Sequence, residues 1–347
     1  MSPRSPRGAA ALSGVALLLL TSCGAGDAPN GKQATDAALA DPYVLVLGNA
    51  QDAGLPQIGA DHPLDRAARA EPGKQRFATS VLVCDPRTGK RWLLDATPDL
   101  REQVDLATGH PANRAEYLSS LDLSGRPPLF EGVFLTHAHM GHYLGLAHLG
   151  REAYSADGVP VHASPRMAEF LRANGPWSLL VELQNIALQE MRPGEPVQLD
   201  EDLSVEAFEV PHRSEYSDTY GYLVRGPERT LAYLPDIDKW ERWERPVEEL
   251  LADVDVALLD ATFYAEGEIP GRPMAEIPHP FVAESLARFA PLPASERAKV
   301  HFIHLNHTNP LGDPDGEARR AVRAAGCDVA RQGQVFSLGG VDESNDG

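Results

Sequence analysis

The chain has 347 residues, 43% of them hydrophobic and 23% charged, and its formal net charge at pH 7 is −19. That length suffices for one large domain or two ordinary ones, and the hydrophobic fraction suffices for a sizeable core. The negative balance would repel a nucleic-acid backbone, so nonspecific binding of DNA or RNA is not expected. The sequence shows no repeat with a period of about 20 to 50 residues, which argues against a solenoid or a propeller.

The first residues have the features of a targeting segment. Two arginines precede an apolar run over residues 9–20 that is too short to span a bilayer as a mature helix. Small residues and then Cys23 follow, a pattern that resembles a bacterial lipobox. The resemblance implies a signal peptide over residues 1–22, cleavage before Cys23 and lipidation of that cysteine. An ordinary secretory signal or an uncleaved signal anchor is the alternative.

The segments that follow predict one exported domain. Residues 23–40 are rich in Gly, Ala, Asp and Asn and are expected to form a flexible tether. Residues 41–339 are expected to form the folded domain, and residues 340–347 a disordered tail. The lipid on Cys23 would anchor the protein to a membrane on the periplasmic side, at the outer membrane if the cell is Gram-negative.

Two cysteines, Cys84 and Cys327, remain in the predicted domain. An oxidising compartment allows a disulfide between them, and two buried free thiols are the alternative.

The predicted elements mix strands and helices. A buried strand over residues 43–48 comes first, and a hairpin follows with strands over 80–84 and 91–95. A helix then runs through residue 106, with Pro98 near its first turn. Further strands are expected over 133–135, 160–163, 203–210, 220–224, 230–234, 256–260, 299–304 and 334–338, and further helices over 142–149, 165–173, 247–252, 281–289 and 317–325. Residues 177–191 fit either a strand or an apolar flap.

Three histidines, His137, His139 and His142, follow the apolar strand over residues 133–135. Residues i and i+2 of a strand point to the same side, so His137 and His139 can face one point, and His142 opens the next helix. Imidazole is a common ligand of zinc and of iron. A histidine-rich surface loop is the alternative, but the strand–loop–helix context favours a metal motif.

Histidine or aspartate follows a buried strand repeatedly along the chain. The residues are Asp95, His137, His139, His212, Asp236, Asp260 and His304. One such residue is more often a cap or a buried polar group, but their recurrence indicates a sheet edge that carries a metal site. Asp52, in the loop after the first strand, is a candidate for the rim of that site.

The motifs resemble those of the metallo-β-lactamase superfamily, in which His-x-His-x-Asp-His after a strand precedes a His, an Asp and a final His. Residues 137–142 match the first block, and His212, Asp236 and His304 match the later ligands in order. Within the superfamily the chain is similar to the family of pyrroloquinoline quinone (PQQ) biosynthesis protein B. That similarity covers residues 48–57, 136–146, 211–219 and 304–310. The resemblance implies an α/β fold, a metallo-β-lactamase-like four-layer αβ/βα sandwich with the metals at one edge.

The chain departs from these relatives in two places. Gly141 stands where hydrolytic members have an aspartate that binds the second metal. Residues 58–60, directly after Gln57, contain no thiol, whereas the family has a cysteine-rich structural zinc motif there. The export signal is also unusual for a cofactor pathway that works in the cytoplasm.

The resemblance implies one or two Zn²⁺ ions, with Fe²⁺ as an alternative metal. One ion would be held by His137, His139 and His212, and a second by His142, Asp236 and His304, with Asp236 bridging and orienting the nucleophile. Without a carboxylate at position 141 the second site is short of charge, so occupancy by one metal is also compatible with the sequence. Candidates for holding the ligands or contacting the substrate are Asp52, Asp260, His279 and His307; surface or structural use is the alternative, most of all for His279.

The predicted function is a metal-dependent hydrolase that acts on an unknown small molecule by a metal-activated water. One alternative is an iron- and oxygen-dependent oxidoreductase or a protein of PQQ biosynthesis or transport. Another is a lipoprotein that binds a small molecule without catalysis. The expected partners are a small-molecule substrate and the membrane, with no nucleic acid.

Overall fold

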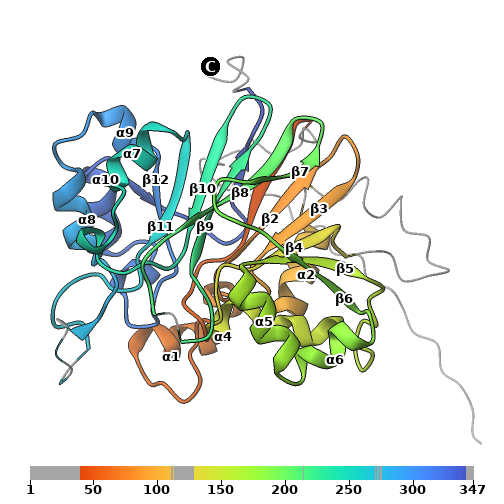
Figure 1. The fold of residues 1–347 in the computed structure, drawn as a ribbon. Helices are drawn as coiled ribbons and strands as arrows, with labels where there is room; N and C mark the ends of the chain where they lie inside the picture. Colours follow the sequence, from red (N-terminus) through yellow and green to blue (C-terminus); the bar gives the residue numbers. More distant parts are fainter. Residues whose placement is uncertain are drawn as a thin grey trace, which may run out of the picture. The chain divides into compact units, whose positions relative to one another are not determined.

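The computed structural model describes residues 40–110, 112, 129–213, 215–269, 271, 273 and 276–340 (Figure 1). All of these belong to one compact unit, residues 37–347. The predicted signal peptide, Cys23 and nearly all of the predicted tether lie outside the described residues, as does the predicted tail beyond residue 340. In the part of the chain that the structure describes, no helix has the length and apolar composition required to cross a membrane.

Two mixed sheets form the centre of the fold. The first has the strand order β14-β1-β2-β3-β4-β5-β6, and the second has the order β13-β12-β11-β10-β9-β8-β7. The first sheet consists of β14 (Val335–Ser337), β1 (Tyr43–Gly48), β2 (Ser80–Asp85), β3 (Lys90–Leu94), β4 (Gly132–Phe134), β5 (Val159–Ala163) and β6 (Ile186–Glu190). The second consists of β13 (Asp328–Val329), β12 (Val300–Ile303), β11 (Val256–Asp260), β10 (Thr230–Leu234), β9 (Tyr220–Arg225), β8 (Leu203–Glu209) and β7 (Pro196–Asp200).

The two faces of each sheet are buried against different layers. In β1, Val44 and Val46 belong to the core between the sheets, whereas Leu45 and Leu47 belong to the core on the helix side. A strand covered on both faces reads as a continuous apolar run, because successive side chains alternate between the faces. This explains the uninterrupted apolar sequences of β1 and of residues 256–259 in β11.

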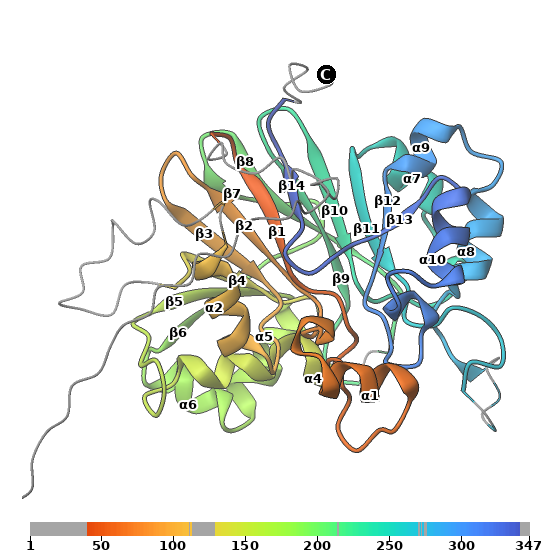
Figure 2. The ribbon, with the colours of Figure 1, turned by 180° about the vertical axis from the view of Figure 1, so that it is seen from behind.

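Helices cover the outer face of each sheet (Figures 1 and 2). Apolar side chains of α2 (Leu100–Gly109), α5 (Pro165–Ala173) and α6 (Trp177–Glu182) join the core outside the first sheet. Those of α7 (Val247–Ala252), α8 (Val282–Phe289) and α10 (Glu317–Ala324) join the core outside the second sheet. Three further helices of the described residues are α1 (Pro63–Ala70), α4 (Met140–Tyr143) and α9 (Ala294–Ala298). The predicted four-layer α/β sandwich is confirmed.

The local predictions differ from the structure in several segments. Residues 177–191, for which a strand or an apolar flap was expected, form helix α6 and then strand β6, and the helix was not predicted. The predicted helix over 142–149 is the short α4, followed by a 3₁₀ turn over Leu144–Leu149. Pro98 precedes α2, which starts at Leu100 and ends at Gly109. The sequence did not predict α1, α9, β7 or β13, because none of these segments has a long apolar period.

The last strand crosses to the other sheet. Instead of extending the sheet of β12 and β13, β14 pairs antiparallel with β1, with Val44 opposite Phe336 (Figure 2). Both cysteines of the domain are buried, and they belong to different cores on the outer sides of the two sheets. No disulfide joins Cys84 to Cys327, because the two sheets separate them.

Candidate metal centre

The candidate centre lies where strands of both sheets end. The segment after β4 carries His137, His139 and His142, and the ends of β8, β10 and β12 carry His212, Asp236 and His304. The predicted ligands thus come together at one edge of the sandwich. This is the expected position for a site in an α/β fold, since strand ends leave the backbone free to direct polar side chains into a crevice.

Asp236 occupies the middle of the cluster. Its Oδ2 atom lies 3.3 Å from Nε2 of His137, 3.6 Å from Nε2 of His142 and 3.8 Å from Nε2 of His304. Its Oδ1 atom lies 3.4 Å from Nε2 of His212. Two ligand atoms on one tetrahedral zinc, each about 2.0–2.1 Å from the ion, are separated by roughly 3.3 Å. The spacing around Asp236 therefore fits ligands that share a cation.

Side chains behind the imidazoles fix the rings. The Nδ1 atom of His137 lies 2.9 Å from the Thr136 hydroxyl, and that of His142 lies 2.8 Å from Asp95 Oδ2. The Nδ1 atoms of His212 and His304 lie 3.2 Å from Asp238 Oδ1 and 2.9 Å from the Thr262 hydroxyl, respectively. A hydrogen bond at one ring nitrogen directs the other nitrogen toward a metal.

Three of the directed nitrogens have no hydrogen-bond partner among the described residues. They are the buried Nε2 atoms of His137, His142 and His304. A buried polar atom without a partner costs about 1–3 kcal/mol, so such atoms are rare unless a ligand satisfies them. The donor chemistry, imidazole with carboxylate, fits a zinc-type cation.

The first group of four donor residues consists of His137, His139, His212 and Asp236, whose donor atoms lie within 4.8 Å of one another. His139 is the most exposed of these side chains. Its Nε2 atom lies 3.2 Å from Glu215 Oε2, which leaves Nδ1 as the nitrogen available to a cation. The three histidines predicted to bind the first ion therefore lie close to one another, and Asp236 belongs to the same group.

The second group contains Asp52, His142 and His304, again with donor atoms within 4.8 Å of one another. The sequence placed Asp52 only at the rim of the site or in a supporting position. In the structure its Oδ1 atom lies 3.7 Å from His142 Nε2. The second group is therefore not short of carboxylate charge, in contrast to the expectation drawn from Gly141.

His279 and Asp260 lie directly behind Asp236. The Nδ1 atom of His279 lies 2.9 Å from Asp260 Oδ2 and 3.1 Å from Asp236 Oδ1. Asp260 also accepts hydrogen bonds from the backbone amides of Ile237 and Thr262. His279 is buried, so the surface alternative does not hold for it.

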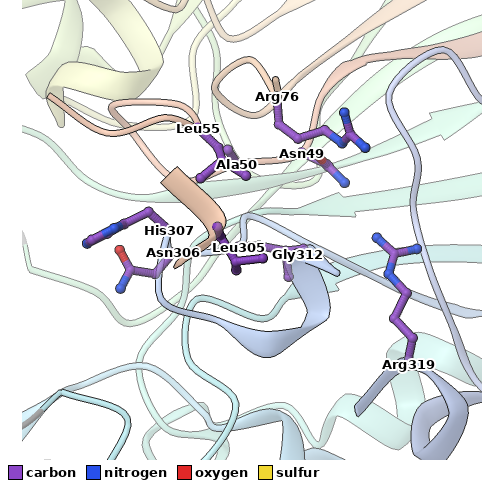
Figure 3. A pocket seen from close by; sticks show the side chains of 10 residues that line it. Asn49, Ala50, Leu55, Arg76, Leu305, Asn306, His307, Gly312 and Arg319 are labelled. Atoms are coloured by element: carbon purple, nitrogen blue, oxygen red, sulfur yellow. The ribbon is translucent and has the colours of Figure 1, made fainter. Parts of the chain in front are cut away.

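His307 belongs to a different environment. Its Nδ1 atom lies 2.8 Å from Oδ2 of Asp65 in α1, and it is in none of the donor groups found among the described residues. It lines a small pocket together with Asn306, Asn49, Arg76 and other residues (Figure 3). Figure 3 shows His307 and Asn306 together on one side of this pocket.

The electrostatics of the centre follow from burial and from proximity of opposite charges. Burial alone would raise the pKa of Asp236, but His212, His304 and His279 lower this pKa well below its usual value. Burial lowers the pKa of His137. Burial also acts to lower the pKa of His142, but Asp95 and other carboxylates raise it to about 9. The negative charge that raises this pKa is also the charge that a cation would neutralise.

Two residues at the centre have a left-handed backbone. Asp95, directly after β3, has φ 65°, and His304, directly after β12, has φ 68°. For residues other than glycine this conformation costs on the order of 1–3 kcal/mol and is concentrated at functional sites. In both cases the conformation directs the side chain at a strand end into the cluster.

The residues that hold the rings were largely missed from the sequence. Asp95 was recognised only as a strand-end residue, and Thr136, Asp238, Glu215 and Thr262 were not singled out. A usable signal exists for two of them, because Asp238 follows Asp236 by two residues and Thr136 directly precedes His137. Glu215 and Thr262 have no comparable signal.

An aromatic group lies next to the histidine segment. Tyr143 packs against Phe170 and Trp177, with ring centroids 5.6 Å and 4.8 Å apart. Phe170 also stacks on Tyr216, which is 60% exposed. Tyr216 directly follows Glu215, the residue in contact with His139. The group therefore offers an exposed ring close to the first donor group.

Residues 90–305 match the family model described as the β-lactamase superfamily domain. A coenzyme PQQ synthesis protein B from Methylobacterium nodulans is 30% identical over 85% of this chain and 99% of its own length. One from Xanthomonas campestris pv. campestris is 29% identical with the same coverage.

Solved structures show the same fold. Zn²⁺-bound PqqB from Methylobacterium extorquens superposes with a TM-score of 0.70 at 22% identity, over 85% of this chain and 100% of the other. A diphosphatase of the PhnP family superposes with a TM-score of 0.57 at 23% identity, over 85% and 96%. The chain therefore belongs to the metallo-β-lactamase superfamily, within which it is a relative of coenzyme PQQ synthesis protein B.

Proposed function

We propose that this protein is a metal-dependent hydrolase that acts on a small molecule. The observation that carries the proposal is the Asp236 carboxylate, whose oxygens lie 3.3–3.8 Å from the Nε2 atoms of four histidines. A zinc ion held there would lower the pKa of a bound water to about 7 and polarise the bond to be cleaved.

The protein's own residues would position the reacting groups. Asp236 is ionised at neutral pH, because the histidines around it lower its pKa, and it can therefore accept a hydrogen bond from the attacking water. His279 and Asp260 hold this carboxylate from behind. The exposed ring of Tyr216 would contact an apolar part of the substrate beside His139.

A panel of esters, lactones, phosphodiesters and lactams tests the proposal with the zinc-loaded protein. We expect the protein to hydrolyse at least one class of these compounds. A chelator should abolish this activity, and added zinc should restore it. The variant His137→Ala should lose both this activity and bound metal. Full metal content in that variant, or a zinc-loaded protein inactive on the whole panel, would contradict the proposal.

The relatives' names favour a second candidate, a role in the synthesis of PQQ. The support is alignment along nearly the whole length of a protein named coenzyme PQQ synthesis protein B. This candidate differs from hydrolysis if the protein catalyses a reaction that depends on iron and oxygen. Iron retained after anaerobic purification, together with oxygen uptake, would favour it, whereas zinc and no oxygen uptake would favour the hydrolase.

A further inference from the structure

We propose that Asp52 is a metal ligand that replaces the aspartate missing at position 141, so that the centre binds two cations. This inference rests on the metal centre of the proposed function but not on hydrolysis. The second ion would be held by Asp52, His142 and His304, with Asp236 shared between the two ions.

The space that a side chain at position 141 would fill is taken by Asp52. An ideal Cβ placed on Gly141 would lie 2.2 Å from Asp52 Oδ1 and 2.5 Å from Asp52 Cα, distances that real Cβ atoms do not reach. The Gly141 amide also donates a hydrogen bond of 3.2 Å to Asp52 Oδ1. Glycine at this position thus makes room for a carboxylate that comes from another segment.

The backbone holds Asp52 next to the last histidine. The Gln51 amide donates to the Leu305 carbonyl at 2.8 Å, and the Leu305 amide donates to the Asn49 carbonyl at 2.9 Å. These bonds join the loop after β1 to the loop after β12, one residue from Asp52 and one from His304. A donor fixed by backbone hydrogen bonds loses little conformational entropy when it binds.

The imidazoles of His142 and His304 lie in one donor group with Asp52. Their Nδ1 atoms are engaged by Asp95 and Thr262, and their Nε2 atoms are buried without a hydrogen-bond partner among the described residues. Asp52 Oδ1 lies 3.7 Å from His142 Nε2, and Asp236 Oδ2 lies 3.6 Å from the same nitrogen. Two carboxylates and two imidazoles form a complete donor set for a four-coordinate cation.

A purely structural role is the competing explanation for Asp52, since its oxygen accepts the Gly141 amide. The variant Asp52→Asn separates the two roles, because the asparagine oxygen can still accept that hydrogen bond but carries no charge. The matched control is Asp61→Asn, which removes an exposed carboxylate of the same region that pairs with the surface residue Arg66.

Zinc content per chain, measured by elemental analysis after loading and gel filtration, is the readout, together with the absorption spectrum of the cobalt-loaded protein. We expect about two ions in the wild type and in Asp61→Asn, and about one in Asp52→Asn. Asp52→Asn should keep the wild-type circular dichroism spectrum.

Two bound ions in Asp52→Asn with unchanged cobalt spectrum would overturn the inference, and so would a single ion in the wild type. A wild type with one ion that still hydrolyses a substrate leaves the proposed function intact and removes only this inference. If the wild type binds two ions and Asp52→Asn binds one, this inference is supported. If that wild type is also inactive on the whole panel, the proposed function is contradicted.

Discussion

Asp95 Oδ2 lies 2.8 Å from Nδ1 of His142, and the same carboxylate accepts hydrogen bonds from the Thr136 amide and the Tyr233 hydroxyl. Asp95 is fully buried and directly follows β3 of the first sheet, whereas Tyr233 lies in β10 of the second. One carboxylate thus orients a candidate ligand and also joins the two sheets at the edge where the metal centre lies.

Asp95→Asn should weaken binding of the second ion. Asparagine tolerates the left-handed backbone at this position but cannot hold an imidazole with a full negative charge. Loss of such a partner typically lowers metal affinity about 10–100-fold. Competition with a chromophoric chelator measures the affinities of both ions. Asp238→Asn, which removes the partner of His212, is the matched control and should weaken the first ion instead. Equal effects on both ions in both variants would contradict this division.

His304→Ala and His307→Ala should differ sharply, although the two residues lie in the same loop. His304 is buried with Nε2 directed at the cluster, whereas His307 pairs with Asp65 outside it. Zinc content should fall by about one ion in His304→Ala and stay unchanged in His307→Ala. Saturating zinc should also raise the melting temperature less in His304→Ala, because only the folded state binds the metal. Metal loss in His307→Ala would contradict this prediction, because it would show that zinc binding depends on the conformation of the loop and not on the His304 side chain.

Stability should decrease below neutral pH through His162. This residue stacks on Phe134 with ring centroids 4.4 Å apart, and burial lowers its pKa to about 4. The unfolded chain binds a proton near pH 6.5 and the folded chain does not, so folding becomes less favourable as the pH falls from about 6.5 to about 4. The loss from this residue is on the order of 1–3 kcal/mol.

Urea unfolding of the metal-free protein at pH 7 and at pH 4.5 measures this loss. The wild type should lose more free energy of unfolding between the two pH values than His162→Gln, whose side chain does not titrate. The comparison removes the contribution of the other histidines, since both proteins contain them. An equal loss in both proteins would exclude His162 as a source of acid sensitivity.

Tyr216→Ala should weaken substrate binding without slowing the chemical step. The exposed ring stacks on Phe170 beside the residue that contacts His139. Loss of one aromatic contact of about 0.5–1.5 kcal/mol corresponds to roughly a 2–10-fold rise in KM for substrates with an aromatic group, with kcat unchanged. Ile58→Ala removes another exposed apolar side chain and should change neither constant. A fall in kcat alone would mean that Tyr216 contacts the reacting atoms.

Local patterns were sufficient for the strands that carry the ligands. Continuous apolar runs such as β1 indicate burial on both faces, and polar residues just past the strands, among them Asp236 after β10 and His304 after β12, mark one sheet edge. The order of the histidines and the aspartate along the chain then indicated the superfamily. The edge strand β7 was missed because its alternate exposed residues resemble a loop.

Long-range contacts could not be predicted in the same way. His279 comes from a loop without a strand pattern, and its burial depends on the small core of Phe263, Ile277 and Phe281. The separation of Cys84 from Cys327 depends on which face of which sheet each thiol occupies.

By itself, the sequence determined the α/β class, the strand ends and the identity of most donor side chains, because these depend on residue type and short spacing. Only the tertiary structure decided which carboxylate approaches His142. Asp52 and Gly141 are 89 positions apart, and the backbone bonds between the loops after β1 and β12 form only once the chain has folded.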